Sequence, residues 1–160
     1  MSPSTPAQDL SNSTAKTPRQ RWMAVLARAS AEAIAADLPP ADSLPAWRLL
    51  RGPDSGLIML RARTGGAGAP FNLGEMTVTR CTLRLATGEV GHATVAGRDG
   101  RHAELAALAD ALLQDPAHHD CLLTGLIDKL AAGQDAARQA IAARASATRV
   151  QFFALQTMRT

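Results

Sequence analysis

The sequence predicts an α+β fold, because amphipathic helical patterns lie on both sides of a run of strand-like segments. The strand-like segments fall between residues 47 and 96 and are separated by glycine-containing turns, as in antiparallel hairpins. A chain of 160 residues can bury one hydrophobic core without disulfides or a structural metal. We therefore expect an N-terminal helix, an antiparallel sheet of about four strands in two hairpins, and two to three C-terminal helices that pack on the sheet and on partners.

The composition argues against a membrane protein and a nucleic-acid binder. No apolar stretch approaches the roughly 20 residues that span a bilayer. There is no signal-peptide pattern at the N-terminus, and the two cysteines lie in apolar sequence, so we expect a reducing cytoplasm. The net charge of +3 comes mostly from arginine, which suits anionic ligands or acidic partners. Aromatic residues make up only 3% of the chain, so platforms for stacking bases are scarce.

The N-terminal region divides at Thr17. Residues 1–16 are rich in Ser, Thr, Pro and Asn, and we expect a disordered leader there, followed by a single domain over 17–160. Thr17 is a favourable N-cap, with Pro18 at the first helical position and Gln20 placed to complete a capping box. The apolar spacing that follows predicts one amphipathic helix, which ends before Pro39.

Four strand-like segments follow the helix, and we expect them to form two hairpins. A turn of sequence GPDSG joins the first two, and a two-residue turn at Thr87 and Gly88 joins the last two. The four segments are residues 47–51, 57–63, 75–85 and 89–96.

The two-residue turn also predicts the register of the second hairpin. It places Leu83 opposite His92, so that His92 shares a core-like face with Cys81. The opposite face carries Arg80 and Arg84 and is mixed and basic. A mixed face on a sheet suggests contact with something polar or with another chain.

Helical patterns return after the last strand. The first helix begins with a cap at Asp99 or a neighbour and ends before Pro116, and its apolar stripe should cover the sheet. From about residue 117 we expect two further helices, separated by a break at Gly133. We expect these helices to extend onto a partner. Asp110 stands inside the alanine-rich first helix, where an acid predicts a contact with a partner or an ion pair with an arginine.

The glycine-rich loop before residue 75 is the most informative motif. Gly65, Gly66 and Gly68 permit positive φ angles or the close approach of another chain or an anion. The loop lacks the Lys-Ser/Thr pair of a P-loop, and its spacing does not match a dinucleotide-binding fingerprint. Two interpretations stay open, a flexible connection between strands and a partner-docking loop, and docking is the stronger functional one.

The candidate contact residues lie in and around this loop. Their alternative interpretation is an ordinary solvent-exposed strand surface. Glu75 and Arg80 are five apart on one strand, so they point to opposite faces and do not pair. Glu75, Arg80 and His92 are candidates for a catalytic role, and none is assigned one. The residues expected to contact a partner or an anion are Arg63, Gly65, Gly66, Gly68, Asn72, Glu75, Arg80 and Arg84.

No metal or cofactor is expected to bind this chain alone. His92 has too few ligand-type neighbours for zinc, so a hydrogen-bonded core histidine is the preferred interpretation. His118, His119 and Cys121 form a second candidate cluster, but on a helix position 119 does not share a face with the other two. The chain also lacks a nucleophile elbow and the HExxH and CxxC motifs, so it does not look like a self-sufficient enzyme.

Several segments together resemble the PhnG family of the bacterial carbon-phosphorus lyase system. They occur in the family's order, and the similarity returns at TRVQFF near the C-terminus. The ending departs from the family's usual pattern, in which an acidic residue stands at the position of Gln151. The segments are RQRWMAVLARA, GLIMLRARTGGAGAPFNLGEMTVTR, LRLATGEVGHATVAGRD and HAELAALADALLQDP.

The resemblance implies a support subunit in a cytoplasmic hetero-oligomeric core with PhnI-, PhnH- and PhnJ-type partners, of which the PhnI type is the most direct. With PhnH, PhnI and PhnL, the family takes part in displacing adenine from ATP by a phosphonate, which gives α-D-ribose 1-phosphonate 5-triphosphate. ATP is then a substrate of the complex. The chemistry is usually assigned to PhnI. The alternative is that residues of this chain contribute directly to ATP or phosphonate binding or to catalysis.

Overall fold

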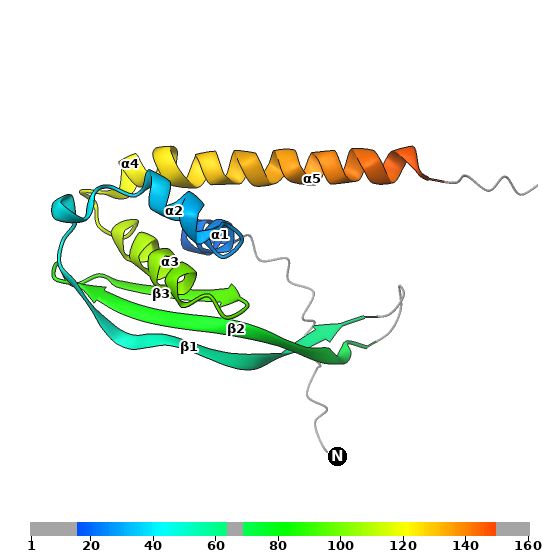
Figure 1. The fold of residues 1–160 in the computed structure, drawn as a ribbon, viewed down its shortest axis with the longest axis horizontal. Coiled ribbons are helices and arrows are strands. Elements are labelled where there is room, and N and C mark those ends of the chain that lie inside the picture. Colours follow the sequence, from blue (N-terminus) through cyan, green and yellow to red (C-terminus); the bar gives the residue numbers. More distant parts are fainter. Residues whose placement is uncertain (1–15, 64–68, 150–160) are drawn as a thin grey trace, which may run out of the picture.

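The computed structural model describes residues 16–63 and 69–149 and shows a sheet with all of its helices on one side (Figure 1). The sheet is antiparallel, has three strands in the order β1-β2-β3, and is covered directly by helix α3. The α+β class is therefore confirmed, with three strands where about four were expected. The strands are β1 (Trp47–Ala62), β2 (Phe71–Leu85) and β3 (Val90–Ala96).

β1 is one continuous strand, so the predicted hairpin with a turn at residues 52–56 is wrong. The chain does not turn back at GPDSG. Near this segment the register of its pairing with β2 shifts between Leu49 and Arg51 and again between Arg51 and Asp54. Pro53 lacks an N–H group, which an edge strand such as β1 tolerates. The glycine and proline residues therefore mark an irregular stretch within a strand, which long-range pairing with β2 keeps extended.

The turn between β2 and β3 contains three residues where two were expected. The N–H of Leu85 donates to the carbonyl of Glu89 at 2.9 Å, and the N–H of Gly88 donates to the carbonyl of Leu85 at 3.0 Å. Gly88 has a φ angle of +117°, which favours glycine and is usual at the end of a three-residue hairpin loop.

The extra residue in the turn shifts the β2–β3 register by one. Leu83 lies opposite Gly91, and His92 lies opposite Thr82. The predicted pair of Leu83 and His92 is therefore wrong. Because side chains alternate along a strand, the shift moves His92 to the sheet face that Cys81 does not occupy.

The helices begin largely where the sequence predicts. Thr17 caps the first helix with the expected capping box, and the Asp99 side chain accepts a hydrogen bond from the N–H of His102 at the start of α3. No helix in the described part of the chain is long and apolar enough to cross a membrane. The helical elements are α1 (Pro18–Leu26), α2 (Ala31–Asp37), the 3-10 turn η1 (Ala41–Ser43), α3 (Gly100–Leu112), α4 (His119–Leu122), the π-helical η2 (Leu123–Asp128) and α5 (Lys129–Ala147).

Two predicted helix boundaries are wrong. The single N-terminal helix is in fact α1 and α2, because the Ser30 hydroxyl accepts a hydrogen bond from the N–H of Ala33 and caps a new helix. The break expected at Gly133 does not occur, since this residue lies within α5. One glycine costs a helix about 1 kcal/mol, and the surrounding alanines favour the helix enough to offset that cost.

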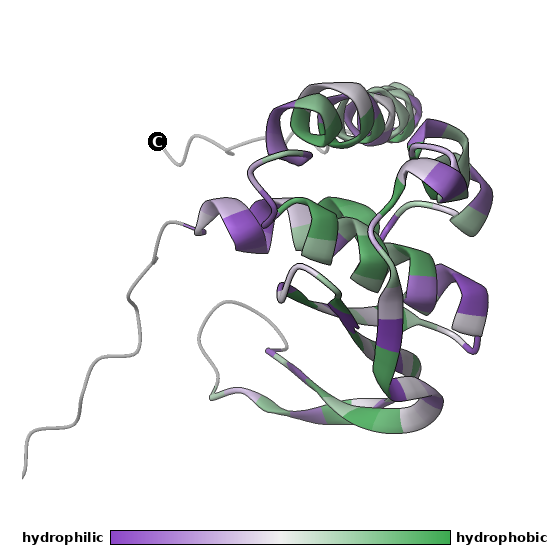
Figure 2. Ribbon diagram, turned by 90° about the vertical axis from the view of Figure 1, so that its left-hand side faces the viewer, coloured by the Kyte–Doolittle hydropathy of each residue, from purple (hydrophilic) through white to green (hydrophobic). Residues whose placement is uncertain are grey.

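α3 packs very close to β3 because both surfaces are made of small residues. A Cβ atom on Gly91 would lie 1.9 Å from the carbonyl oxygen of Ala107 and 2.8 Å from the backbone nitrogen of Ala111, so only glycine fits here. The hydrophobic α3 thus runs between the sheet and the outer helices (Figure 2). Larger side chains fill the core around it, including Trp22, Leu26, Ile34, Leu83, Leu85, Val95, Leu112, Leu113, Leu122 and Leu126.

Asp110 is fully buried on α3 and joins it to α1 and β3. Its carboxylate accepts hydrogen bonds from Arg19 Nε at 3.1 Å and Nη2 at 2.7 Å, and from Trp22 Nε1 at 2.9 Å. It also accepts the backbone N–H of His92 at 2.9 Å. Of the two contacts that the sequence allows for Asp110, the ion pair with an arginine is therefore the one present, and one carboxylate ties three elements together.

We predict that Gly91→Ala destabilises the fold by about 3 kcal/mol or more, since the new methyl group meets rigid backbone and not a mobile side chain. Gly74→Ala is the matched control, because no atom lies within 4 Å of the added Cβ at that position. Urea denaturation of both variants measures the difference. Equal stabilities would contradict the close α3–β3 contact.

We also predict that Asp110→Asn lowers the free energy of unfolding by about 3 kcal/mol, because an NH₂ group replaces an oxygen that accepts buried donors. Asp135→Asn is the comparison, since Asp135 pairs with Arg138 on an exposed helix surface and such pairs contribute under about 1 kcal/mol. Thermal and urea unfolding give both values. A loss at position 110 no greater than that at 135 would show that the buried network is dispensable.

Candidate interaction surface

The outer parts of β1 and β2 form a two-stranded arm that extends past the rest of the sheet (Figure 1). β3 ends at Ala96, which pairs with Val78, and Gly97 adds one hydrogen bond from its N–H to the carbonyl of Thr77 at 2.9 Å. Beyond this point the described parts of β1 and β2 form a ladder with each other alone. We define the arm as residues 57–62 and 71–77. A two-stranded ribbon has little stability of its own in water, so the arm depends on whatever packs against it.

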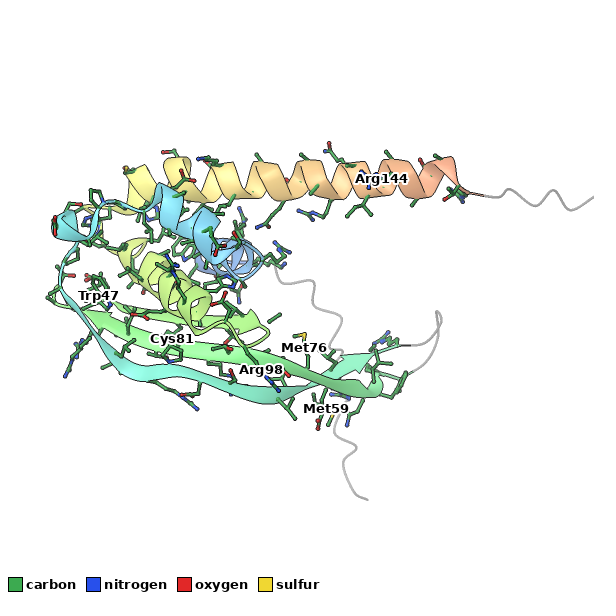
Figure 3. All side chains as sticks on the ribbon, in the orientation of Figure 1. Trp47, Met59, Met76, Cys81, Arg98 and Arg144 are labelled. Atoms are coloured by element: carbon green, nitrogen blue, oxygen red, sulfur yellow. The ribbon has the colours of Figure 1, made fainter. Side chains whose placement is uncertain are left out.

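Apolar side chains cover both faces of the arm. Side chains alternate along a strand, so Leu57 and Met59 point to one face and Ile58 to the other. Figure 3 shows Met59 and Met76 on opposite sides of the ribbon. Leu57 is 63% exposed and Met59 is 52% exposed, although both are large apolar residues. A cluster of this kind on a protein surface typically marks an interaction site. The large, exposed apolar residues of the arm are Leu57, Met59, Leu60, Phe71 and Leu73.

The glycine-rich loop lies between β1 and β2 in the sequence. Gly65, Gly66 and Gly68 lie outside the described residues, so their docking role stays a prediction. Beside the loop, Arg61 Nη2 contacts the carbonyl of Pro70 at 3.5 Å.

The predicted polar contact residues in and next to the arm are all exposed. Arg63 directly follows β1, Asn72 lies opposite Arg61, and Glu75 lies opposite Met59. Within the ranges that the structure describes, none of these side chains takes part in an ion pair. The arm therefore combines apolar faces with polar groups that are free to contact another chain.

Arginines line the sheet face that none of the described helices covers. Arg80 and Arg84 alternate with buried residues of β2 and so point to this face. Arg48 of β1 lies opposite Arg84 in the ladder, and Arg51 lies opposite Thr82. Arg80 and Arg84 lie on one face as predicted, but Ala93 and Val95, which the predicted register places on the same face, are buried on the opposite one. β1 contributes two arginines that the sequence analysis did not include because it assigned residues 47–51 to a different hairpin. We call Arg48, Arg51, Arg80, Arg84, Thr82 and His92 the basic face.

His92 lies on the basic face, which corrects the expectation of a core histidine. It is exposed, and its Nδ1 lies 3.1 Å from the hydroxyl oxygen of Thr82. It shares this face with Arg80, whereas Glu75 lies on the arm. The structure therefore does not bring the three catalytic candidates together.

Cys81 is buried on the opposite face of the sheet. Burial raises the pKa of its thiol, and the nearby acids Glu104 and Asp54 raise it further. A thiol with a raised pKa is a poor nucleophile at neutral pH. Cys81 is therefore a packing residue in this core.

The histidines near residue 118 have structural partners. His118 Nδ1 contacts Asp115 at 2.7 Å, and His119 packs edge-on against Trp22. The pKa of Asp115 lies below its ordinary value because the N–H of Ala117 and the ring of His118 donate to its carboxylate. In the described parts of the chain, no group of three or more His, Cys, Asp or Glu side chains is placed to hold a metal ion.

Comparison with known proteins gives consistent matches to a family model and to a curated relative. A family model described as phosphonate metabolism protein PhnG matches residues 17–159. The chain is also 44% identical over 137 residues to the alpha-D-ribose 1-methylphosphonate 5-triphosphate synthase subunit PhnG of Rhizobium meliloti (strain 1021). This alignment covers 86% of the present chain and 87% of that relative. Both findings agree with the resemblance that the sequence motifs indicate.

Proposed function

Because this chain belongs to the PhnG family of phosphonate metabolism proteins, we propose that it is a non-autonomous subunit of a carbon-phosphorus lyase core complex. It supports the step in which a phosphonate displaces adenine from ATP to give α-D-ribose 1-phosphonate 5-triphosphate. A PhnI-type subunit carries out this chemistry and contacts the chain directly. PhnH- and PhnJ-type subunits complete the cytoplasmic assembly, and ATP is a substrate of the complex.

The exposed apolar arm is the observation that carries this proposal. Its large apolar side chains lie on both faces of a ribbon that the hydrophobic core does not reach. Removing apolar surface from water is favourable by about 25 cal/mol per Å², so a protein that covers both faces gains substantial binding energy. In a subunit such a surface can be buried against a partner, whereas in a protein that works alone it would stay exposed to water, which is unfavourable.

The separation of the polar candidates also favours a supporting role. Nucleophilic and acid–base catalysis require groups within hydrogen-bonding distance of one another or of a shared substrate. Arg80 and His92 lie on the basic face, and Glu75 lies on the arm beyond the end of β3. Contacts to separate parts of a partner fit this distribution better than one catalytic centre does.

We predict that the double variant Leu57→Glu, Met59→Glu weakens binding to a PhnI-type subunit by at least about 100-fold, because two charges lose their hydration in the interface. Both side chains are more than half exposed, so the free chain keeps its fold. Co-purification from a co-expressing strain and a titration of the purified subunits measure the loss. Ile141→Glu is the control, since Ile141 is a comparably exposed apolar residue, at 65%, outside the arm.

The outcomes of this experiment distinguish an error about the binding surface from an error about the proposed function. Undiminished binding of the double variant would remove the arm from the interface. Failure of the unmodified chain to bind any subunit of the assembly would contradict the proposed function itself.

Direct participation of this chain in ATP or phosphonate binding is the second candidate function. It is favoured by the exposure of Arg80 on a face with His92 and Thr82, where a guanidinium group could reach a phosphate. Arg80 forms no ion pair within residues 16–63 and 69–149.

For the supporting role, we predict that Arg80→Ala and Glu75→Ala each leave adenine release by the intact, reconstituted complex within about 3-fold of the unmodified rate. Loss of a group that stabilises the transition state typically costs about 100-fold or more. Size-exclusion chromatography of the same samples verifies that the assembly is intact. A drop of that size in an intact assembly would favour direct participation.

A further inference from the structure

Arg48 and Arg84 face each other across the β1–β2 ladder. Side chains at directly opposed positions have their Cβ atoms about 5 Å apart, and like charges there are destabilising. Arg84 Nε donates to the carbonyl of Gly88 at 3.2 Å, and neither arginine forms an ion pair with a residue that the structure describes. The described part of the chain therefore holds two positive charges together with no anion of its own between them.

The two arginines line a shallow hollow of about 220 Å³ at the end of the sheet remote from the arm. Trp47, Leu85 and Ala86 contribute apolar walls to this hollow. Figure 3 shows Trp47 at this end of β1 and Met59 at the other. Guanidinium groups bind carboxylate oxygens through paired N–H donors, so the hollow has the chemistry to hold one carboxylate group.

The rest of the basic face extends the positive charge along β2. Arg80 lies four residues from Arg84, about 13 Å along the strand, and points to the same face. The acids beside these arginines are already engaged. Asp54 pairs with Arg51 at 2.5 Å, and Glu89 accepts a hydrogen bond from the hydroxyl of Thr87.

The shape of the basic face favours a protein over a small anion. Small-molecule sites are usually clefts of about 300 to 1,000 Å³ that enclose most of the ligand. The hollow between Arg48 and Arg84 is smaller and open, and Arg80 lies well away from it. Carboxylates spread over a protein surface match this spacing.

We propose that the basic face docks an acidic surface of a partner subunit, with one carboxylate of that subunit seated between Arg48 and Arg84. This inference rests on the proposed function, since it presumes that the chain assembles with other subunits. The two ends of the β1–β2 ladder then do different things. The arm supplies apolar contact area, and the basic face sets the orientation and the rate of encounter.

The test is the double variant Arg48→Glu, Arg84→Glu, assayed for its rate of association with the purified partner subunits. We expect the rate to fall at least tenfold at about 50 mM salt, with a smaller difference at about 300 mM salt, where charges are screened. The control, Arg28→Glu, Arg101→Glu, changes the net charge equally through two exposed arginines on the helical layer and should alter the rate less than about 2-fold. Circular dichroism verifies the fold, and Arg48→Gln, Arg84→Gln replaces the first variant if it does not fold.

Two results would overturn the inference. In the first, the double variant associates at the same rate and with the same salt dependence as the control variant, and the unmodified chain still assembles. The proposed function then remains valid. The other is a calorimetric titration in which the free chain binds tripolyphosphate and the double variant does not, while the variant still assembles normally. That result would assign the hollow to a phosphate ligand. If the unmodified chain fails to assemble at all, the proposed function and this inference both fall.

Discussion

The buried carboxylate of Asp110 is the contact on which the arrangement of the layers depends. α3 is rich in alanine, and small residues alone specify its rotation and its position along β3 only weakly. The carboxylate supplies what they lack, because it accepts donors from α1 and from the backbone of β3. Its reach to the N–H of His92 in turn requires the close approach that Gly91 permits. A charge with this many donors is stable in the interior, whereas a poorly satisfied one is costly.

This network also determines what the molecule presents to its surroundings. The described helices cover one face of the sheet, and within residues 16–63 and 69–149 the opposite face and the arm remain in solvent (Figure 1). The Asp110 carboxylate binds β3 through the backbone N–H of His92, so the side chain of His92 stays on the basic face beside Thr82. The surface that we assign to a partner is therefore firmly supported at its basic end and supported by two strands alone at its apolar end.

Local signals in the sequence predicted local features well, and long-range pairing decided the rest. The caps at Thr17 and Asp99 and the arginine partner of Asp110 follow from residue types and their spacing, and they were predicted. The GPDSG segment carries the signal of a turn, but the ladder with β2 keeps it extended, and no local pattern reveals that. The number of residues in the turn before β3 depends on the backbone angle at Gly88, so the register and the face of His92 were missed. The motifs identify the family, yet the contribution of Arg48 and the arm to the surface depends on β1 being one continuous strand, which no local pattern predicts.

β1 has a further consequence for the life of the free protein. It is an edge strand of 16 residues, and long exposed edges pair readily with other chains. Pro53 and the arginines oppose such pairing along much of its length, but the apolar stretch from Leu57 to Leu60 has no such protection. Copies that are made in excess of their partner would therefore self-associate through this stretch. The amount of usable subunit in a cell would thus follow the supply of the partner, which favours synthesis of the two chains in matched amounts.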